Sequence, residues 1–138
     1  MHAGGCLCGA VRYVIDGALA PVQLCYCGQC RKAQGSAFAA NIPVESASFR
    51  LTAGRDQLAE YRASPGKRRV FCSVCGSPIF SQRDDASASL RLRAGTLDEP
   101  VDLAIAYHFM VGSKARWWTI SGDLPQHDEL PPDRKPTT

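Results

Sequence analysis

The sequence predicts an all-β protein. Short segments rich in β-branched and aromatic residues recur about every ten residues, with Gly, Pro, Ser or Asp between them. Residues 89–94 (SLRLRA) alternate leucine with arginine, which is typical of a strand with one buried face. Helical periodicity is scarce. Together these observations favour a sandwich, a barrel or a folded sheet with little helix.

The predicted elements follow one another closely. The predicted strands, in chain order, are residues 10–15, 22–27, 36–43, 47–52, 57–62, 67–72, 77–82, 89–94 and 101–109. One or two turns of helix are predicted after Cys27, through GQCRKAQG, because Gly35 is a typical helix terminator. We expect residues 1–130 to form a single domain. Residues 131–138, with their prolines and charges, are expected to form an extended C-terminal tail.

Composition and charge exclude several classes of protein. The 138 residues carry a formal net charge of only +3, and no long basic block is present, so we expect no nucleic-acid partner. The short run Lys67-Arg68-Arg69 is interpreted as a solvated strand end, in preference to a phosphate-binding patch. No apolar stretch is long enough to span a membrane, and no signal-peptide pattern is present. We therefore expect a cytoplasmic protein without membrane association.

Seven cysteines in a chain without an export signal indicate metal or redox chemistry rather than a disulfide scaffold. They form the groups Cys6-x-Cys8, Cys25-x-Cys27-x-x-Cys30 and Cys72-x-x-Cys75. A glycine directly follows one cysteine of each group, which suits tight turns whose backbone amides point at sulfur. In an extended segment, Cys6 and Cys8 direct both sulfurs to the same side.

The count of ligands predicts two zinc sites. A structural zinc site takes four ligands, and the simplest partition joins the two pairs, Cys6 and Cys8 with Cys72 and Cys75. This site closes a loop of about 65 residues, at an entropic cost that zinc binding can supply. The remaining Cys25, Cys27 and Cys30 would form a second site with one exchangeable position, the pattern of catalytic zinc, from which the metal is lost more easily.

Other interpretations of the cysteines stay open at this point. All seven could be unmetallated core residues, although their spacing argues against it. A histidine could close the second site, and His2, His108 and His127 are the only candidates. None of them lies at knuckle spacing from the triplet. The triplet could also act as a redox group without metal, because C-x-x-C thiols exchange readily.

An open three-cysteine zinc site is suited to thiol chemistry. Three thiolates and one divalent ion carry a net charge of about −1, so the metal is a weak Lewis acid and lowers the pKa of water poorly. A fourth, incoming thiol can lose its proton there and stay nucleophilic toward a small carbonyl. We therefore favour carbon–sulfur bond chemistry over hydrolysis.

The chain resembles the glutathione-dependent formaldehyde-activating enzyme family, also called the GFA or CENP-V/GFA domain. The resemblance lies in GGCLCGAVRY, CYCGQCRKAQGSAF, FCSVCGSPIF, HFMVGSKARWW and LPQHDELP, and covers roughly residues 4–130. It implies a β-tent fold and the same partition of two zinc ions. It also implies the activity of S-(hydroxymethyl)glutathione synthase, a carbon–sulfur lyase that reversibly joins glutathione and formaldehyde. A family histidine between the first two cysteines of the triplet is Tyr26 here, and a phenol is a poor base at neutral pH.

The expected substrate contacts are cationic because glutathione carries two carboxylates. Arg31, directly after Cys30, and Lys114 are the candidates for binding them. The leading hypothesis is a zinc-dependent carbon–sulfur lyase with Cys25, Cys27 and Cys30 at its catalytic centre. The alternative is a non-catalytic, zinc-stabilised binding module on the same fold. The oligomeric state and the true thiol and aldehyde are not predicted.

Overall fold

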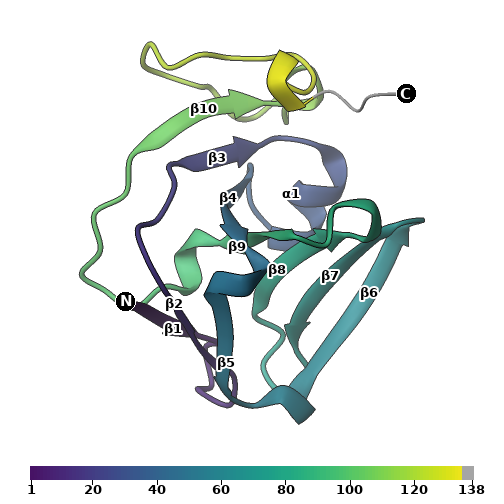
Figure 1. The fold of residues 1–138 in the computed structure, drawn as a ribbon. Helices are drawn as coiled ribbons and strands as arrows, with labels where there is room; N and C mark the ends of the chain where they lie inside the picture. The colour runs from purple at the N-terminus through teal and green to yellow at the C-terminus, as the bar shows by residue number, and fades with distance from the viewer. Residues whose placement is uncertain (135–138) are drawn as a thin grey trace.

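The computed structural model describes residues 1–134 and consists of two β-sheets with one short α-helix (Figure 1). The strands are β1 (His2–Gly5), β2 (Arg12–Ile15), β3 (Val22–Cys25), β4 (Ala39–Glu45), β5 (Phe49–Ala53), β6 (Leu58–Ser64), β7 (Lys67–Cys72), β8 (Pro78–Arg83), β9 (Ser89–Arg93) and β10 (Ile105–Phe109). The helix is α1 (Gly28–Gln34). Single 3-10 turns are η1 (Ser46–Ser48), η2 (Arg55–Gln57), η3 (Asp84–Ala86), η4 (Ala94–Thr96), η5 (Val111–Ser113) and η6 (Pro132–Arg134).

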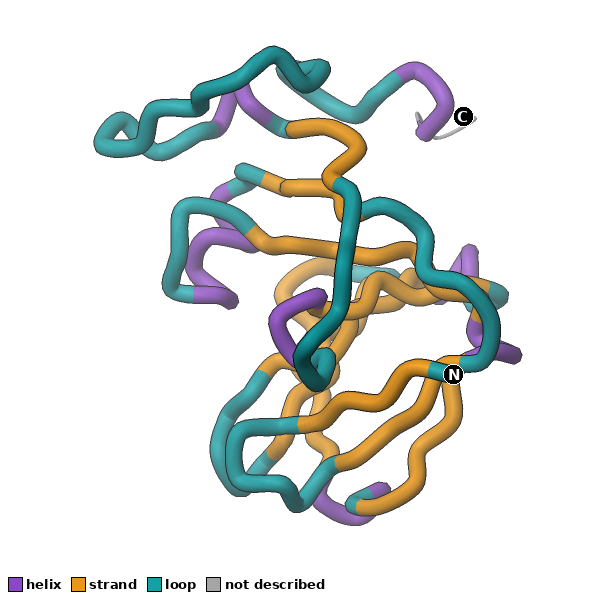
Figure 2. Tube along the Cα trace, turned by 90° about the vertical axis from the view of Figure 1, so that its left-hand side faces the viewer, coloured by secondary structure: helices purple, strands orange, loops and turns teal. Residues whose placement is uncertain are grey.

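The smaller sheet has three strands in the order β1-β2-β5, and the larger sheet has seven in the order β10-β3-β4-β9-β8-β7-β6. All pairs are antiparallel except β10 with β3. Figure 2 shows the strands stacked along the length of the molecule, with β10 and the C-terminal segment at the end farthest from the small sheet. The prediction of an all-β fold with little helix is confirmed, and the two sheets are those expected for a β-tent.

One hydrophobic core joins the two sheets. Phe49 of β5 stacks on Tyr13 of β2 at a ring-centroid distance of 5.1 Å, and it meets Phe80 of β8 edge-on at 5.4 Å. Leu90 and Leu92 face this core from β9, as the alternation in residues 89–94 predicted. Burial of these side chains is the main stabilising contribution, at about 25 cal/mol per Å² of apolar surface.

Each predicted strand overlaps an observed one, with ends that differ by a few residues. The predicted strand 101–109 is wrong over residues 101–104, because pairing with β3 begins only at Ile105. The strand β1 was missed, since its sequence HAGG contains no β-branched or aromatic residue. It pairs with β2 in register from His2 with Ile15 to Gly5 with Arg12.

The predicted helix is confirmed at both ends. Cys27 is the N-cap residue, and its sulfur accepts a hydrogen bond from the amide of Cys30 at 3.3 Å. Gly35 ends the helix with φ of +61°, a left-handed conformation that glycine adopts at low cost. The boundary between the domain and the C-terminal tail at residue 130 stays a prediction. Pro132–Arg134 form η6, and the rest of the predicted tail lies outside the described residues. No helix in the described chain has the length and apolarity needed to cross a bilayer.

Candidate metal centres

Four cysteines converge at the end of the molecule where β1 ends and β7 turns into β8. The sulfurs of Cys6, Cys8, Cys72 and Cys75 all lie within 4.8 Å of one another. The distance between the sulfurs of Cys6 and Cys8 is 3.6 Å, and that between Cys8 and Cys72 is 3.9 Å. A zinc–sulfur bond of about 2.3 Å in a regular tetrahedron places the sulfurs about 3.8 Å apart. The cluster therefore has the dimensions of a closed four-thiolate zinc site.

Backbone and hydroxyl groups orient the four-cysteine cluster. The amide of Val11 donates to the sulfur of Cys6 at 3.2 Å, after a turn in which Gly9 has a φ of +80°. The hydroxyl of Ser77 lies 3.2 Å from the sulfur of Cys75, and this hydrogen bond lowers the pKa of Cys75 to about 5. The Ser77 hydroxyl also accepts from the amide of Leu7 at 2.9 Å, which ties the two cysteine loops together.

The other three cysteines converge where β3 passes into α1. The sulfurs of Cys25, Cys27 and Cys30 lie within 4.8 Å of one another, with Cys25 and Cys30 buried and Cys27 half-buried. Phe109 of β10 packs against this group. Among the side chains that the structure describes, no histidine nitrogen or carboxylate oxygen joins the three sulfurs at that distance. The donor set fits a zinc ion held by three thiolates.

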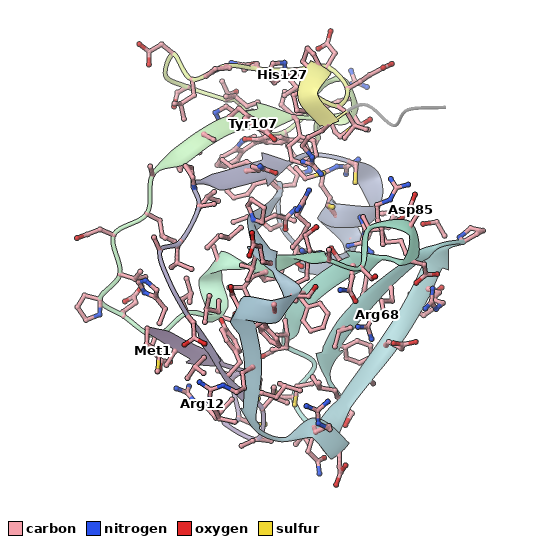
Figure 3. All side chains as sticks on the ribbon, in the orientation of Figure 1. Met1, Arg12, Arg68, Asp85, Tyr107 and His127 are labelled. Carbon is pink, nitrogen blue, oxygen red and sulfur yellow. The ribbon has the colours of Figure 1, made fainter. Side chains whose placement is uncertain are left out.

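The histidines considered as a fourth ligand have other contacts. Nδ1 of the buried His108 lies 2.8 Å from the phenolic oxygen of Tyr26. His127 packs edge-on against the ring of Tyr107 at 5.5 Å, and Figure 3 shows both side chains beside β10 and the C-terminal segment. His2 belongs to β1 in the small sheet. Tyr26 itself packs with Phe38 in the main core, although the cysteines on either side of it belong to the separate metal cluster.

Positive charge surrounds the three-cysteine cluster. Nη2 of Arg69 lies 3.8 Å from the sulfur of Cys30 and 3.4 Å from the side-chain oxygen of Gln29. Hydrogen bonds from Cys25 and Cys27 lower the pKa of Cys30, and the charges of Lys67 and Arg69 lower it further. The pKa of Lys67 is lowered by its own burial. These cations offset the negative charge of a thiolate cluster.

The two cations predicted to contact substrate both make hydrogen bonds to the segment of residues 113–118. Arg31 extends from α1, and its Nη2 donates to the carbonyl oxygen of Ser113 at 3.3 Å. The Lys114 ammonium donates to the backbone oxygens of Ala115, at 3.2 Å, and Trp118. Lys114 thus holds its own loop, whereas Nε of Arg31 is buried without a partner among the described residues. Their roles as substrate contacts stay predictions.

Sequence analysis missed Lys67 and Arg69 as site residues. It interpreted their run as a solvated strand end, but both side chains are partly buried and influence Cys30. The alternation of β7 was a usable signal, because Val70 and Cys72 face the core and Lys67 and Arg69 must therefore share the opposite face. The sequence contained no signal that α1 would cover that face.

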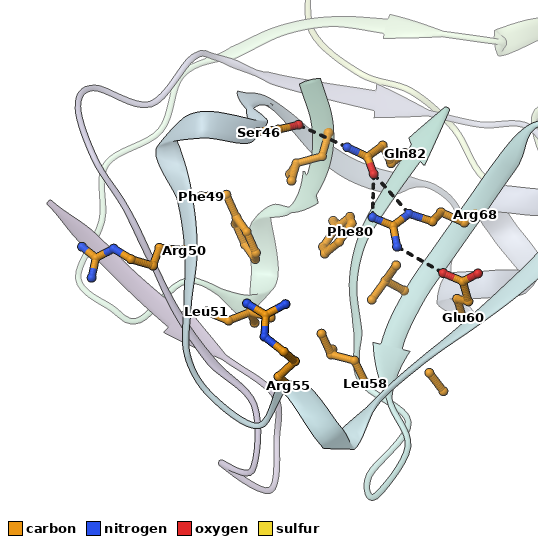
Figure 4. A pocket seen from close by; sticks show the side chains of 13 residues that line it. Ser46, Phe49, Arg50, Leu51, Arg55, Leu58, Glu60, Arg68, Phe80 and Gln82 are labelled. Carbon is orange, nitrogen blue, oxygen red and sulfur yellow. Dashed lines mark hydrogen bonds and ion pairs between the residues drawn. The ribbon is translucent and has the colours of Figure 1, made fainter. Parts of the chain in front are cut away.

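A pocket separate from both cysteine clusters lies between β5 and strands β6–β8 (Figure 4). Its volume is about 410 Å³, and Phe49, Leu58 and Phe80 form an apolar lining. Arg68 lies on its rim and is bound to Glu60 at 3.1 Å and to Gln82. None of its lining residues is a cysteine, so it does not form part of either metal centre.

Comparison with known proteins identifies the family and a structure of similar fold. The sequence model described as "Glutathione-dependent formaldehyde-activating enzyme" matches residues 1–113, which include all seven cysteines. Among solved structures, a crystal structure of a Rhodobacter sphaeroides protein is similar, with a TM-score of 0.61 and 24% sequence identity. The match covers 72% of this chain and 90% of the other, and it shows a shared fold.

Proposed function

Because the chain belongs to the glutathione-dependent formaldehyde-activating enzyme family, we propose that it reversibly joins a thiol to a small aldehyde. The thiol is glutathione or a close relative, and the aldehyde is formaldehyde. The proposed catalytic centre is the cluster of Cys25, Cys27 and Cys30. The proposed cofactor is zinc, with one ion at this cluster and a second, structural ion at the four-cysteine cluster.

The observation that carries this proposal is the incomplete ligand set of the three-cysteine cluster. Three sulfurs meet within 4.8 Å, and none of the other described side chains joins them as a ligand. Three protein ligands with one exchangeable position is the pattern of catalytic zinc. When bound, zinc supplies a positive charge that favours the ionised form of an incoming thiol.

The residues around the cluster provide the rest of the chemistry. The cations Lys67 and Arg69 favour an anionic sulfur beside Cys30. In the reaction, the thiol loses its proton, its sulfur forms a bond to the aldehyde carbon, and the carbonyl oxygen gains a proton. The product is a hemithioacetal, so no oxidant or reductant is required. Phe109 packs beside the sulfurs and limits access of water to them.

The compartment follows from the same chemistry. All seven cysteines are free thiols rather than disulfides, and thiolate ligands must stay reduced to bind zinc. We therefore expect the protein to act in a reducing compartment such as the cytoplasm.

A direct test combines metal content with turnover in the wild-type protein and the Cys27→Ser variant. After reconstitution we expect two zinc ions per wild-type chain and one in the variant, with the thermal unfolding transition retained. Carbon-13 exchange spectroscopy on labelled formaldehyde and glutathione measures adduct formation. We expect catalysed exchange in the wild type and only the uncatalysed rate in the variant. Equal exchange in both proteins would exclude the triplet from catalysis. An absence of catalysis in the zinc-loaded wild type would favour the alternative, a zinc-stabilised binding module.

A further inference from the structure

The two faces of the seven-stranded sheet differ sharply in chemistry. One face carries the leucines, valines and phenylalanines of the main core. On the other face, Arg69 of β7 pairs with Ser81 of β8, and Ser81 pairs with Arg91 of β9. Residues that are directly opposite in a sheet, or two apart along a strand, share a face. Lys67 and Arg93 therefore lie on this face too, which we call the cationic face.

Lys67, Arg69, Arg91 and Arg93 have no carboxylate partner among the side chains that the structure describes. Every ion pair found there involves another basic residue, namely Arg12, Arg50, Arg62, Arg68 or Arg83. Nη1 of Arg69 and Nε of Arg91 are buried without a hydrogen-bond partner among the groups that the structure describes. Removing a cation from water without pairing it is costly, so such a group indicates a missing anion.

A small cavity of about 70 Å³ opens on the cationic face. Its polar lining comes from Lys67, Arg83, Arg91 and Arg134, together with Ser81, Gln82 and Ser89. Arg83 is neutralised by Asp85 at 2.9 Å, and Arg134 donates to the side-chain oxygen of Gln23 at 2.9 Å. The cavity therefore keeps an excess of positive charge, and its volume admits a group of a few heavy atoms.

Lys67 connects this cavity to the three-cysteine cluster. It lines the cavity, and it shares one face of β7 with Arg69. Arg69, two residues further along β7, contacts the sulfur of Cys30. Two residues of a strand span about 7 Å. Two extended residues of a peptide cover about the same distance. In a peptide that contains cysteine, this is the separation between the sulfur and the carboxylate of an adjacent residue.

We propose that this cavity binds a carboxylate of the thiol substrate, whose sulfur lies at the Cys25–Cys27–Cys30 cluster. The inference rests on the proposed function for the position of the sulfur. In this proposal the cations that select the substrate are Lys67 and Arg91. Lys114 is not one of them, because its ammonium donates hydrogen bonds within its own loop.

The test uses a ligand that cannot react. S-methylglutathione keeps both carboxylates but has no thiol, and its dimethyl ester lacks the carboxylate charges. Calorimetry on the zinc-loaded protein should show binding of the acid and binding of the ester that is weaker by roughly 10- to 100-fold, the effect of losing a charged hydrogen bond. Arg91→Gln should weaken binding of the acid to the same extent and leave binding of the ester nearly unchanged.

Two further variants keep this result interpretable. Arg134→Gln changes the cavity from the end of the described chain, where a failure to fold is not expected, and should also weaken binding of the acid. Arg50→Gln makes the same change of charge on the small sheet and should bind like the wild type. Equal binding of acid and ester, wild-type binding by Arg91→Gln and Arg134→Gln, or no binding of the acid would each overturn the proposal.

The proposed function is judged separately. A neutral thiol such as 2-mercaptoethanol has no carboxylate, so its addition to formaldehyde by the wild-type protein reports on the metal cluster alone. Selective binding of S-methylglutathione without this catalysis would support the cavity and contradict the lyase activity. The opposite pattern would support the lyase activity and contradict the cavity.

Discussion

The phenolic oxygen of Tyr26 lies 2.8 Å from Nδ1 of His108, and both side chains are buried. Tyr26 stands between two cysteines of the candidate catalytic cluster, and His108 is on the neighbouring parallel strand β10. The hydrogen bond joins the turn between Cys25 and Cys27 to β10.

Removing this hydrogen bond should destabilise the protein. Tyr26→Phe leaves Nδ1 of His108 without its partner in a buried setting, at a cost of about 1–3 kcal/mol. Denaturant unfolding of the zinc-loaded protein measures the loss. Tyr107→Phe is the matched control, because the Tyr107 hydroxyl is buried without a partner among the described residues and its removal should cost little. Equal losses in the two variants would contradict a specific role for the bond.

The two clusters should differ in what they do for the fold. Cys72→Ser removes a fully buried ligand of the four-cysteine cluster, which links β1 to the β7–β8 turn. Structural zinc contributes about 10–16 kcal/mol, comparable to the whole stability of a domain of this size. We expect the variant to lack a cooperative thermal transition by circular dichroism. A variant that folds normally with one zinc per chain would show that this cluster is not structural.

The side chain of Asn41 accepts a hydrogen bond from the buried guanidinium of Arg93. Nη1 of Arg93 donates to the side-chain oxygen of Asn41 at 2.7 Å, and both residues are buried. Asn41→Leu removes the acceptor and should destabilise the protein by about 1.5–3 kcal/mol in chemical unfolding. The double variant Asn41→Leu/Arg93→Met removes both partners and should recover most of that loss. Additive losses in the double variant would contradict this account.

The turn after β5 should tolerate no side chain at Gly54. A Cβ there would lie 2.1 Å from the carbonyl oxygen of Ala10, and its φ is +84°. This turn packs beside the Cys8–Ala10 loop, and Gln57 accepts from the amide of Ser73 at 2.7 Å, so it supports both halves of the four-cysteine cluster. Gly54→Ala should therefore lower zinc retention during chelator titration as well as stability.

Gly17→Ala separates the steric effect at Gly54 from the backbone effect. Gly17 has the same φ of +84°, but nothing lies within 4 Å of the added methyl group. Its substitution should cost only the left-handed penalty of about 1–2 kcal/mol and leave zinc retention unchanged. Equal effects of both substitutions would show that the close approach of Ala10 is unimportant.

Local patterns in the sequence were sufficient for much of this structure. Alternation predicted the strands, and Gly35 predicted the end of α1. The cysteine motifs predicted the two groups of sulfurs that meet in space. The two pairs together supply the four ligands of a closed zinc site, and the triplet remains as the second group. β1 was not predicted, because its strand conformation comes from pairing with β2 and not from the propensity of its own residues.

The sequence by itself determined the class of fold, the short helix and the grouping of the sulfurs, since each depends on residues close together in the chain or on ligand count. Only the tertiary structure decided which cations lie near the sulfurs. Lys67 and Arg69 come from β7 and Arg91 from β9, and the sheet register places all three on one face, where Arg69 contacts the sulfur of Cys30. Register and the covering of a face arise from pairing and burial over long sequence distances, and such contacts leave no local pattern to read.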